Sequence, residues 1–135
     1  MEIPAQTLCF LTLSELSALL EKREVTSVDV TRAVLERIRE LNPRLRAYLT
    51  VLDESALRQA KAADREIAAG KRRGPLHGVP VAVKDLCWTR DVPTTCASKV
   101  LRDWRPDTNA TVVDRFEAAG AVLLGKLHLT EFAMA

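Results

Sequence analysis

Lys84 is the residue of this chain whose type and position best suit proton-transfer chemistry. It follows the apolar run Val79 to Val83, whose β-branched residues predict a strand buried on both faces. Ligands of open α/β sheets gather at the carboxyl ends of strands, and Lys84 lies at such an end. Burial there would lower the pKa of the lysine from about 10.4 toward neutrality, as a general base requires. The alternative is that Lys84 reaches water, paired with Asp85.

Other polar residues near this strand are weaker candidates for chemistry. We expect His77 to pack and to bond to the backbone of its loop, and Asp85 to cap a turn. Thr95 and Ser98 fit ordinary hydrogen bonding within a loop. A Cys-His hydrolase built on Cys96 with either histidine is a remote possibility, because a loop cysteine and two histidines occur together by chance.

Two amphipathic helices are expected at the start of the chain. Thr12 and Glu15 have the spacing of a capping box, which predicts a helix that ends near Arg23. Ser27 is the expected cap of the second helix, which should stop at Asn42-Pro43 because the residue before proline avoids the helical region.

Alternating strands and helices are expected after this pair. Residues 47–52 suit a strand, and Asp53 should cap a third helix that ends at Gly70. Residues 71–75 are expected to form a solvated basic loop. A fourth helix, capped by Asn109, should precede a buried strand over 121–124. The inward residues of the third helix should be Ala56, Ala60, Ala63 and Ile67.

Composition indicates a soluble globular protein rather than a disordered one. The 135 residues are 47% hydrophobic and 28% charged, with a net charge of +2 that gives no strong attraction to nucleic acid or anionic lipid. The three cysteines form no CxxC pair, so we expect no disulfide, no metal site and a location in the cytoplasm. The apolar stretch 8–13 is too short to span a membrane and follows no basic leader, so we expect no membrane span and no signal peptide. No cofactor is expected. Residues 1–135 should form one partial domain, with a helical pair in 11–42 and a lysine-strand region in 74–135.

The sequence around Lys84 resembles the amidase signature family. Residues 74–85, Gly-Pro-Leu-His-Gly-Val-Pro-Val-Ala-Val-Lys-Asp, match the family segment that carries its catalytic lysine. The resemblance continues in residues 93–99, 109–113, 120–121 and 125–126, and in Glu131-Phe132-Ala133-Met134. The two leading helices also resemble the start of these enzymes, so the resemblance extends over nearly the whole chain, from Leu11 to Ala135.

This resemblance implies an α/β fold, a mixed sheet covered by helices, and a catalytic triad. In such a triad the lysine takes a proton from a bridging serine held in a cis peptide, and that serine deprotonates the nucleophilic serine. The nucleophile then attacks an amide carbonyl and forms an acyl-enzyme. Lys84 would be the catalytic residue here. Met134 resembles a family residue near the mouth of the site and is a candidate for substrate binding, although core packing is the more frequent role of a methionine.

Both family serines lie in a glycine- and serine-rich region that would follow Met134, so only one member of the triad is expected in this chain. We therefore expect the isolated chain to be an inactive N-terminal part of an amidase that acts on a small amide substrate. A fragment of the A subunit of tRNA-dependent amidotransferase, which releases ammonia from glutamine, is the alternative from the same family. A noncatalytic interaction module is the alternative from another class. Exposed sheet edges should favour self-association or a complementing chain.

Overall fold

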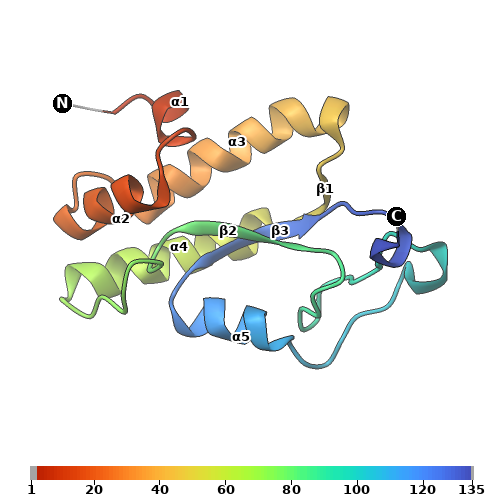
Figure 1. The fold of residues 1–135 in the computed structure, drawn as a ribbon. Helices are drawn as coiled ribbons and strands as arrows, with labels where there is room; N and C mark the ends of the chain where they lie inside the picture. The colour runs from red at the N-terminus through yellow and green to blue at the C-terminus, as the bar shows by residue number, and fades with distance from the viewer. Residues whose placement is uncertain (1–2, 135) are drawn as a thin grey trace.

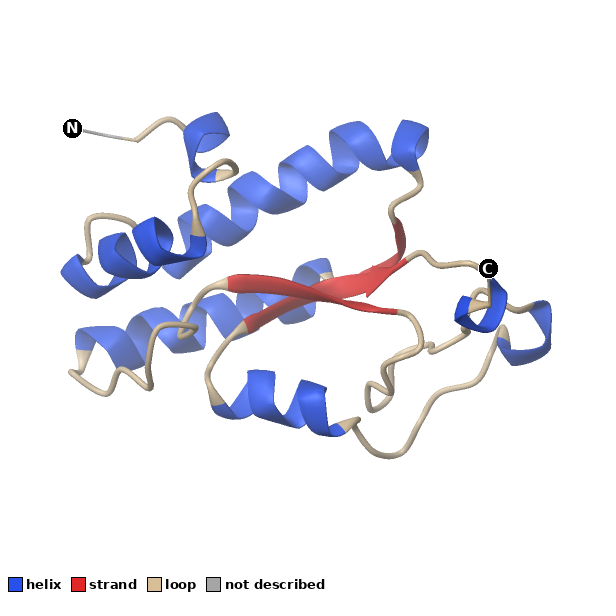
Figure 2. Cartoon of the chain, in the orientation of Figure 1, coloured by secondary structure: helices blue, strands red, loops and turns tan. Residues whose placement is uncertain are grey.

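The computed structural model of the protein describes residues 3–134 and contains one small mixed sheet with helices on both faces (Figure 1) (Figure 2). This arrangement confirms the expected α/β class. In chain order its elements are α1 (Ala5–Leu8), α2 (Leu13–Lys22), α3 (Ser27–Leu45), β1 (Tyr48–Val51), α4 (Asp53–Ala68), β2 (Pro80–Lys84), η1 (Lys99–Leu101), α5 (Thr111–Ala118), β3 (Val122–Leu127) and η2 (Glu131–Ala133).

The sheet has the strand order β1-β3-β2, so β3 is central and the other two strands form the edges. β2 runs parallel to β3, and β1 runs antiparallel to it. The carboxyl ends of β2 and β3 therefore meet, with Lys84 paired to Leu127. Within β2 only Val83 is buried. The expectation of a strand buried on both faces is thus wrong for this chain, because the elements that pack on β2 cover its side chains only in part.

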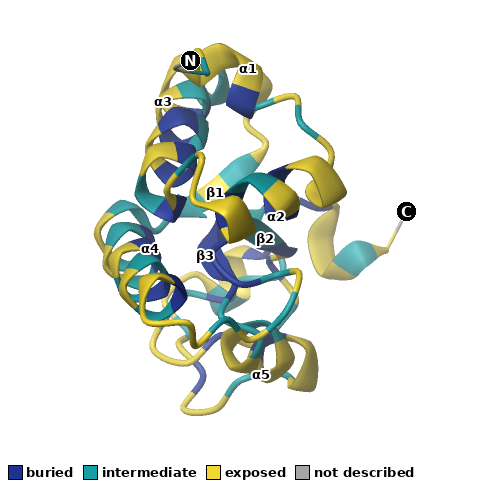
Figure 3. Cartoon of the chain, turned by 90° about the vertical axis from the view of Figure 1, so that its left-hand side faces the viewer, coloured by how far each residue is buried: buried dark blue, intermediate teal, exposed yellow. Residues whose placement is uncertain are grey.

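The two faces of β3 pack against different helices. Val122 and Leu124 lie in a cluster with residues of α3 and α4, whereas Leu123 packs with Val83 and with Val113 of α5. Viewed along the sheet, the buried residues concentrate on β3 and on the helix faces that point toward it (Figure 3). The four inward residues expected in α4 are all buried, which confirms the helical period: Ala56, Ala60, Ala63 and Ile67.

Helix starts were predicted to within one residue. The capping box of Thr12 and Glu15 is present at the start of α2. The N-caps of α3, α4 and α5 are Thr26, Leu52 and Ala110, each one residue before or after the expected cap. In α3 the Thr26 hydroxyl accepts the capping bond, which frees the buried side chain of the next residue for a bond across to the β2 loop.

The expected stop of α3 at Asn42-Pro43 is wrong, because the helix continues through Pro43 to Leu45. Proline in a last turn removes a single helical hydrogen bond. Two local features compensate for that loss. The Asn42 side chain accepts from the Tyr48 amide at 2.8 Å and donates to the Tyr48 carbonyl at 3.1 Å, and Arg46 ends the helix in a left-handed conformation.

Residues 71–75 form a largely exposed loop, as expected, and its arginines also bind two neighbouring helices. The Arg72 guanidinium donates to the Ser17 hydroxyl at 2.6 Å and lies 3.5 Å from a Glu21 carboxylate oxygen, both on α2. Arg73 forms a two-pronged pair with Glu66 of α4, at 2.8 and 2.9 Å. Both arginines therefore bind neighbouring helices while the loop stays largely exposed, and the charge pattern alone did not predict these contacts.

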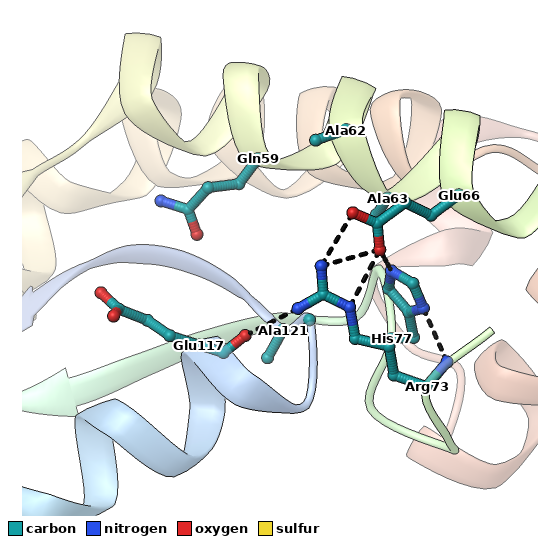
Figure 4. Close-up of a pocket in the computed structure, with 9 residues that line it drawn as sticks. Gln59, Ala62, Ala63, Glu66, Arg73, His77, Glu117 and Ala121 are labelled. Atoms are coloured by element: carbon teal, nitrogen blue, oxygen red, sulfur yellow. Dashed lines mark hydrogen bonds and ion pairs between the residues drawn. The ribbon is translucent and has the colours of Figure 1, made fainter. Parts of the chain in front are cut away.

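His77 completes this cluster and is almost completely buried (Figure 4). Its Nδ1 accepts the Arg73 backbone N–H at 2.9 Å, so the neutral ring carries its proton on Nε2, which lies 3.2 Å from Glu66 Oε2. Burial lowers the pKa of His77 more than the Glu66 carboxylate raises it, and Arg73 and Arg72 lower it further. The expected packing role of His77 is confirmed, and Figure 4 shows the ring beside Arg73 and Glu66.

The depressed pKa of His77 predicts a loss of stability in mild acid. As the pH falls below 6.5, the unfolded chain takes up a proton that the folded chain still rejects, so the stabilisation present at neutral pH is lost. We expect the free energy of unfolding in urea titrations to fall between about pH 7.5 and about pH 5.5, by no more than the ~1.4 kcal/mol per pH unit that one proton allows. In His77→Gln this slope should largely disappear, whereas substitution of the exposed His128 by Gln should retain it. Equal slopes in the two variants would contradict the assignment.

A bulge in β3 sets the orientation of the residues that follow it. Two residues of β3, Leu124 and Gly125, lie opposite a single residue of β2, Ala82. A Cβ atom on Gly125 would lie 2.1 Å from the Thr50 carbonyl oxygen, so only glycine fits between the strands. The close approach of β1 at this point fixes the position of the next side chain, Lys126.

Gly125→Ala is therefore expected to destabilise the chain strongly. The methyl group meets backbone of β1, which cannot rotate away, so we expect a loss of about 3 kcal/mol in the free energy of unfolding, measured by urea titration. Gly70→Ala is the matched control. Gly70 has a left-handed φ of 74° and no atom within 4 Å of its added Cβ, so that variant should cost only about 1 kcal/mol. Similar losses in both variants would show that the contact with Thr50 is unimportant.

Candidate functional site

Lys84 lies at the carboxyl end of β2 with its side chain exposed. Its carbonyl oxygen accepts the Cys87 amide at 2.9 Å in the turn that follows the strand. Among residues 3–134, no hydrogen bond or ion pair engages the Lys84 ammonium group. The expectation that Lys84 is buried is therefore wrong for this chain, whereas its expected place at the end of a parallel strand is confirmed.

The buried lysine of this region is Lys126, near the end of β3. Its side chain has no exposed surface, and its Nζ donates to the Cys87 carbonyl and to the Thr94 hydroxyl, both at 2.8 Å. Nζ also lies 3.4 Å from Oδ1 of Asp85. Burial lowers the pKa of Lys126, and the Asp85 carboxylate opposes that shift. The ammonium group thus donates two hydrogen bonds within the chain and is balanced by the Asp85 carboxylate, with no exposed surface for a substrate to reach.

Asp85 organises the loop that follows β2. Its Oδ2 accepts both the backbone N–H and the hydroxyl of Thr95, at 3.0 and 2.5 Å. Its backbone carbonyl accepts the Cys96 amide at 3.0 Å. The expected role of Asp85 as a turn cap is therefore too modest, because the residue joins a loop ten positions away to the end of the strand.

Strained backbone gathers beside this loop. Cys96 and Ala97 have φ values of 50° and 55°, and Phe132 and Ala133 have φ values of 51° and 58°. The two pairs are adjacent in space, because the Phe132 amide donates to the Cys96 carbonyl at 2.9 Å. Left-handed residues other than glycine each cost about 1 kcal/mol or more, and such outliers concentrate at functional sites. Their clustering marks the region next to Lys84 as the candidate site.

The remaining candidate residues have the following positions. Ser98 donates to a Glu131 carboxylate oxygen at 2.7 Å, which confirms a role in loop hydrogen bonding. Met134 is 78% exposed, so core packing does not explain it in this chain. Burial raises the pKa of the Cys96 thiol, and the Asp85 carboxylate raises it further. That shift disfavours the thiolate that a Cys-His hydrolase would need.

Groups of acidic, histidine or cysteine side chains that could bind a metal ion do not occur within residues 3–134. Over the same range, no helix is long and apolar enough to cross a bilayer. The cysteines Cys9, Cys87 and Cys96 are free thiols.

Sequence reasoning missed the pairing of Lys126 with Asp85. A signal was present, because a lysine in the otherwise apolar run Val122 to Leu127 must find a counter-charge if the strand is buried. The left-handed residues gave no such signal, since neither glycine nor asparagine occupies those positions.

Comparison with known sequences finds longer proteins that resemble this chain over part of their length. The chain is 50% identical over 123 residues to the protein designated amidase AmiD of Mycobacterium tuberculosis, with 91% of this chain and 26% of the relative covered. It is also 50% identical over 127 residues to the A subunit of glutamyl-tRNA(Gln) amidotransferase from Moorella thermoacetica, with 94% and 26% covered. The chain thus spans about a quarter of the length of the curated relatives that it matches.

Solved structures share the same arrangement of elements. Native peptide amidase from Stenotrophomonas maltophilia superposes with a TM-score of 0.88 at 38% identity, over 94% of this chain and 26% of that enzyme. Fatty acid amide hydrolase superposes with a TM-score of 0.87 at 23% identity, over 95% of this chain and 23% of that enzyme, a likeness of fold alone. A family model described as Amidase matches residues 29–135. The chain therefore belongs to the Amidase family.

Proposed function

We propose that this chain is the lysine-bearing part of an amidase that hydrolyses carboxylic amide C–N bonds through a Ser-cisSer-Lys triad. In this proposal residues 1–135 are part of one cytoplasmic domain, and Lys84 is its general base. The supporting observation is the Lys84 ammonium group, which has no partner among residues 3–134 and lies at the carboxyl end of β2, within a family motif and beside strained backbone. Met134, exposed near the strained turn, is proposed to contact substrate.

The proposed proton transfers follow from what a serine nucleophile needs. A hydroxyl attacks an amide carbonyl only when a base removes its proton, and the bridging serine would pass that proton to the Lys84 amine. Collapse of the tetrahedral intermediate would break the C–N bond and release the amine with a proton returned through the same chain. Water would then hydrolyse the acyl-enzyme. Lys84 must be deprotonated at the start, so the serine-bearing part of the enzyme must shield it from solvent.

A hybrid enzyme tests the role of Lys84. In the hybrid, residues 1–135 replace the matching quarter of the Stenotrophomonas maltophilia peptide amidase, and ammonia release from a peptide amide is measured. We expect Lys84→Ala to lower kcat/KM by about 10³-fold or more, because a triad without its base loses the activation of its nucleophile. Lys99→Ala, which changes an exposed lysine of η1, should remain within about twofold of the unmodified hybrid.

Two outcomes would contradict this proposal. One is a folded hybrid that lacks activity although the unmodified peptide amidase is active in the same assay. The other is a Lys84→Ala hybrid that retains activity. The isolated chain should show no turnover, so amide hydrolysis by that chain, abolished by Lys84→Ala, would also overturn the proposal as stated.

The A subunit of a tRNA-dependent amidotransferase is the second candidate. It is supported by the 50% identity to the corresponding protein of Moorella thermoacetica. Residues 127–130, Leu-His-Leu-Thr, favour a general amidase instead, since the amidotransferase resembles this chain less at that point. Copurification of the chain with tRNA and with a B-type partner protein would reverse this preference.

We also propose that the isolated chain associates through its open sheet. β1 and β2 each have one strand neighbour in the part of the chain that the structure describes, and Trp88, Val100 and Phe132 expose large apolar side chains. Sedimentation should therefore show a molecular mass that rises with concentration in the micromolar range. A monomer at all concentrations, with a sharp melt at high temperature, would contradict this expectation.

A further inference from the structure

The ammonium group of Lys126 joins the ends of two neighbouring strands. Lys126 belongs to β3, whereas its acceptors Asp85 and Cys87 follow β2, and Thr94 lies in the next loop. Both charged side chains are buried, with 0% exposure for Lys126 and 1% for Asp85. A charge without water must be balanced by partners in fixed positions, so this pair allows little freedom to the backbone that carries it.

That backbone includes Lys84. Asp85 is its immediate neighbour, and the Asp85 amide donates to the Leu127 carbonyl at 3.0 Å. Cys87, whose carbonyl accepts from Lys126, donates its own amide to the Lys84 carbonyl at 2.9 Å. Asp85 and Cys87, which both contact Lys126, therefore restrict the backbone from which the Lys84 side chain projects.

The same network reaches the strained segments. Asp85 accepts two hydrogen bonds from Thr95 and one from the Cys96 amide, and the Cys96 carbonyl accepts from Phe132. Each left-handed residue needs surrounding contacts to hold it in place. The buried pair supplies those contacts for the turn at Cys96, and through that turn it connects with the segment that ends at Met134.

Of the Asp85 carboxylate oxygens, Oδ2 is fully used by Thr95, whereas Oδ1 is buried and faces only the Lys126 ammonium group, at 3.4 Å. Loss of the positive charge would leave this oxygen without compensation. The rotation of Asp85 that would then follow must disturb Thr95 and Cys96 before it disturbs the distant helices. Loss of the Lys126 charge should thus disturb this loop first and the helices later.

We propose that Lys126 is a positioning residue, whose buried ammonium group, held among Asp85, Thr94 and Cys87, fixes the backbone beside Lys84 and the left-handed turn at Cys96 and Ala97. Its importance for catalysis rests on the proposed function of Lys84. The network itself does not, because its contacts lie within this chain. Lys126 is enclosed by these three residues with no exposed surface, so it cannot meet a substrate and is not the general base.

Amide hydrogen exchange in the 135-residue chain tests the network without any turnover. In Lys126→Met the amides of Thr95 and Cys96, which donate to Asp85, should exchange about tenfold or more faster relative to the Val30 amide in α3. Lys99→Met, an exposed lysine near the same loop, is the matched control and should change neither ratio. A uniform acceleration at all amides, or none, would overturn the proposal.

If Lys126→Met fails to fold, further measurements still test the proposal. Thr94→Val removes one acceptor of Lys126 and keeps the charge pair, and it should accelerate exchange at the same two amides. In the unmodified chain, nitrogen NMR should detect a charged, slowly exchanging Lys126 ammonium group near neutral pH. A neutral amine there would overturn the proposal. The double variant Asp85→Asn with Lys126→Met should recover part of the protection, because it leaves no unpaired buried charge.

In the hybrid enzyme, a positioning role predicts a split between the kinetic constants. Lys126→Met should lower kcat by about 10²-fold while KM stays within about twofold, because a small displacement of a base slows proton transfer more than it weakens binding. An unchanged kcat in a folded variant would overturn the link to Lys84. An inactive unmodified hybrid would contradict the amidase proposal alone, and local exchange in the 135-residue chain would still decide whether Lys126 fixes the turn.

Discussion

The carboxyl end of this sheet depends on one buried cation, Lys126, and on the aspartate that balances it. Removing an ammonium group from water is costly unless acceptors and a counter-charge surround it, and here two hydrogen bonds and the Asp85 carboxylate do so. The acceptors come from the end of β2 and from the loop that follows it, so satisfying the charge also determines where that loop lies. Gly125 allows this arrangement, since it belongs to the bulge that precedes Lys126 and leaves room for the close approach of β1.

Much of the fold could be predicted because its determinants are local. Helical spacing identified the buried residues of α4, and the capping box identified the start of α2. Strand positions followed from runs of β-branched residues. Failures occurred where a distant side chain changed the local balance. The helix α3 passes through Pro43 because Asn42 bonds to Tyr48, and the arginines of the basic loop find partners on α2 and α4.

The candidate site was predictable in part, and for a different reason. The position of Lys84 follows from the strand that it ends, which any chain with this motif would form. The environment of Lys84 was not predictable from the strand, because burial depends on what covers the edge. Within residues 3–134 no strand pairs with the outer edge of β2, and the lysine at its end is exposed. The strained turns were hidden as well, since alanine, cysteine and phenylalanine give no sign of a left-handed conformation.

The two lysines show why burial alone does not identify a general base. Lys126 satisfies the usual criterion, because it is buried and its pKa is lowered. Its ammonium group nevertheless donates two hydrogen bonds within the same chain, and loss of its charge would leave the Asp85 carboxylate unbalanced. Lys84 has the opposite properties, since its ammonium group is free to meet a hydroxyl but remains in water. A working base must combine the freedom of Lys84 with a dry environment, and within this fold only a layer placed over the edge of β2 can supply the second condition without removing the first.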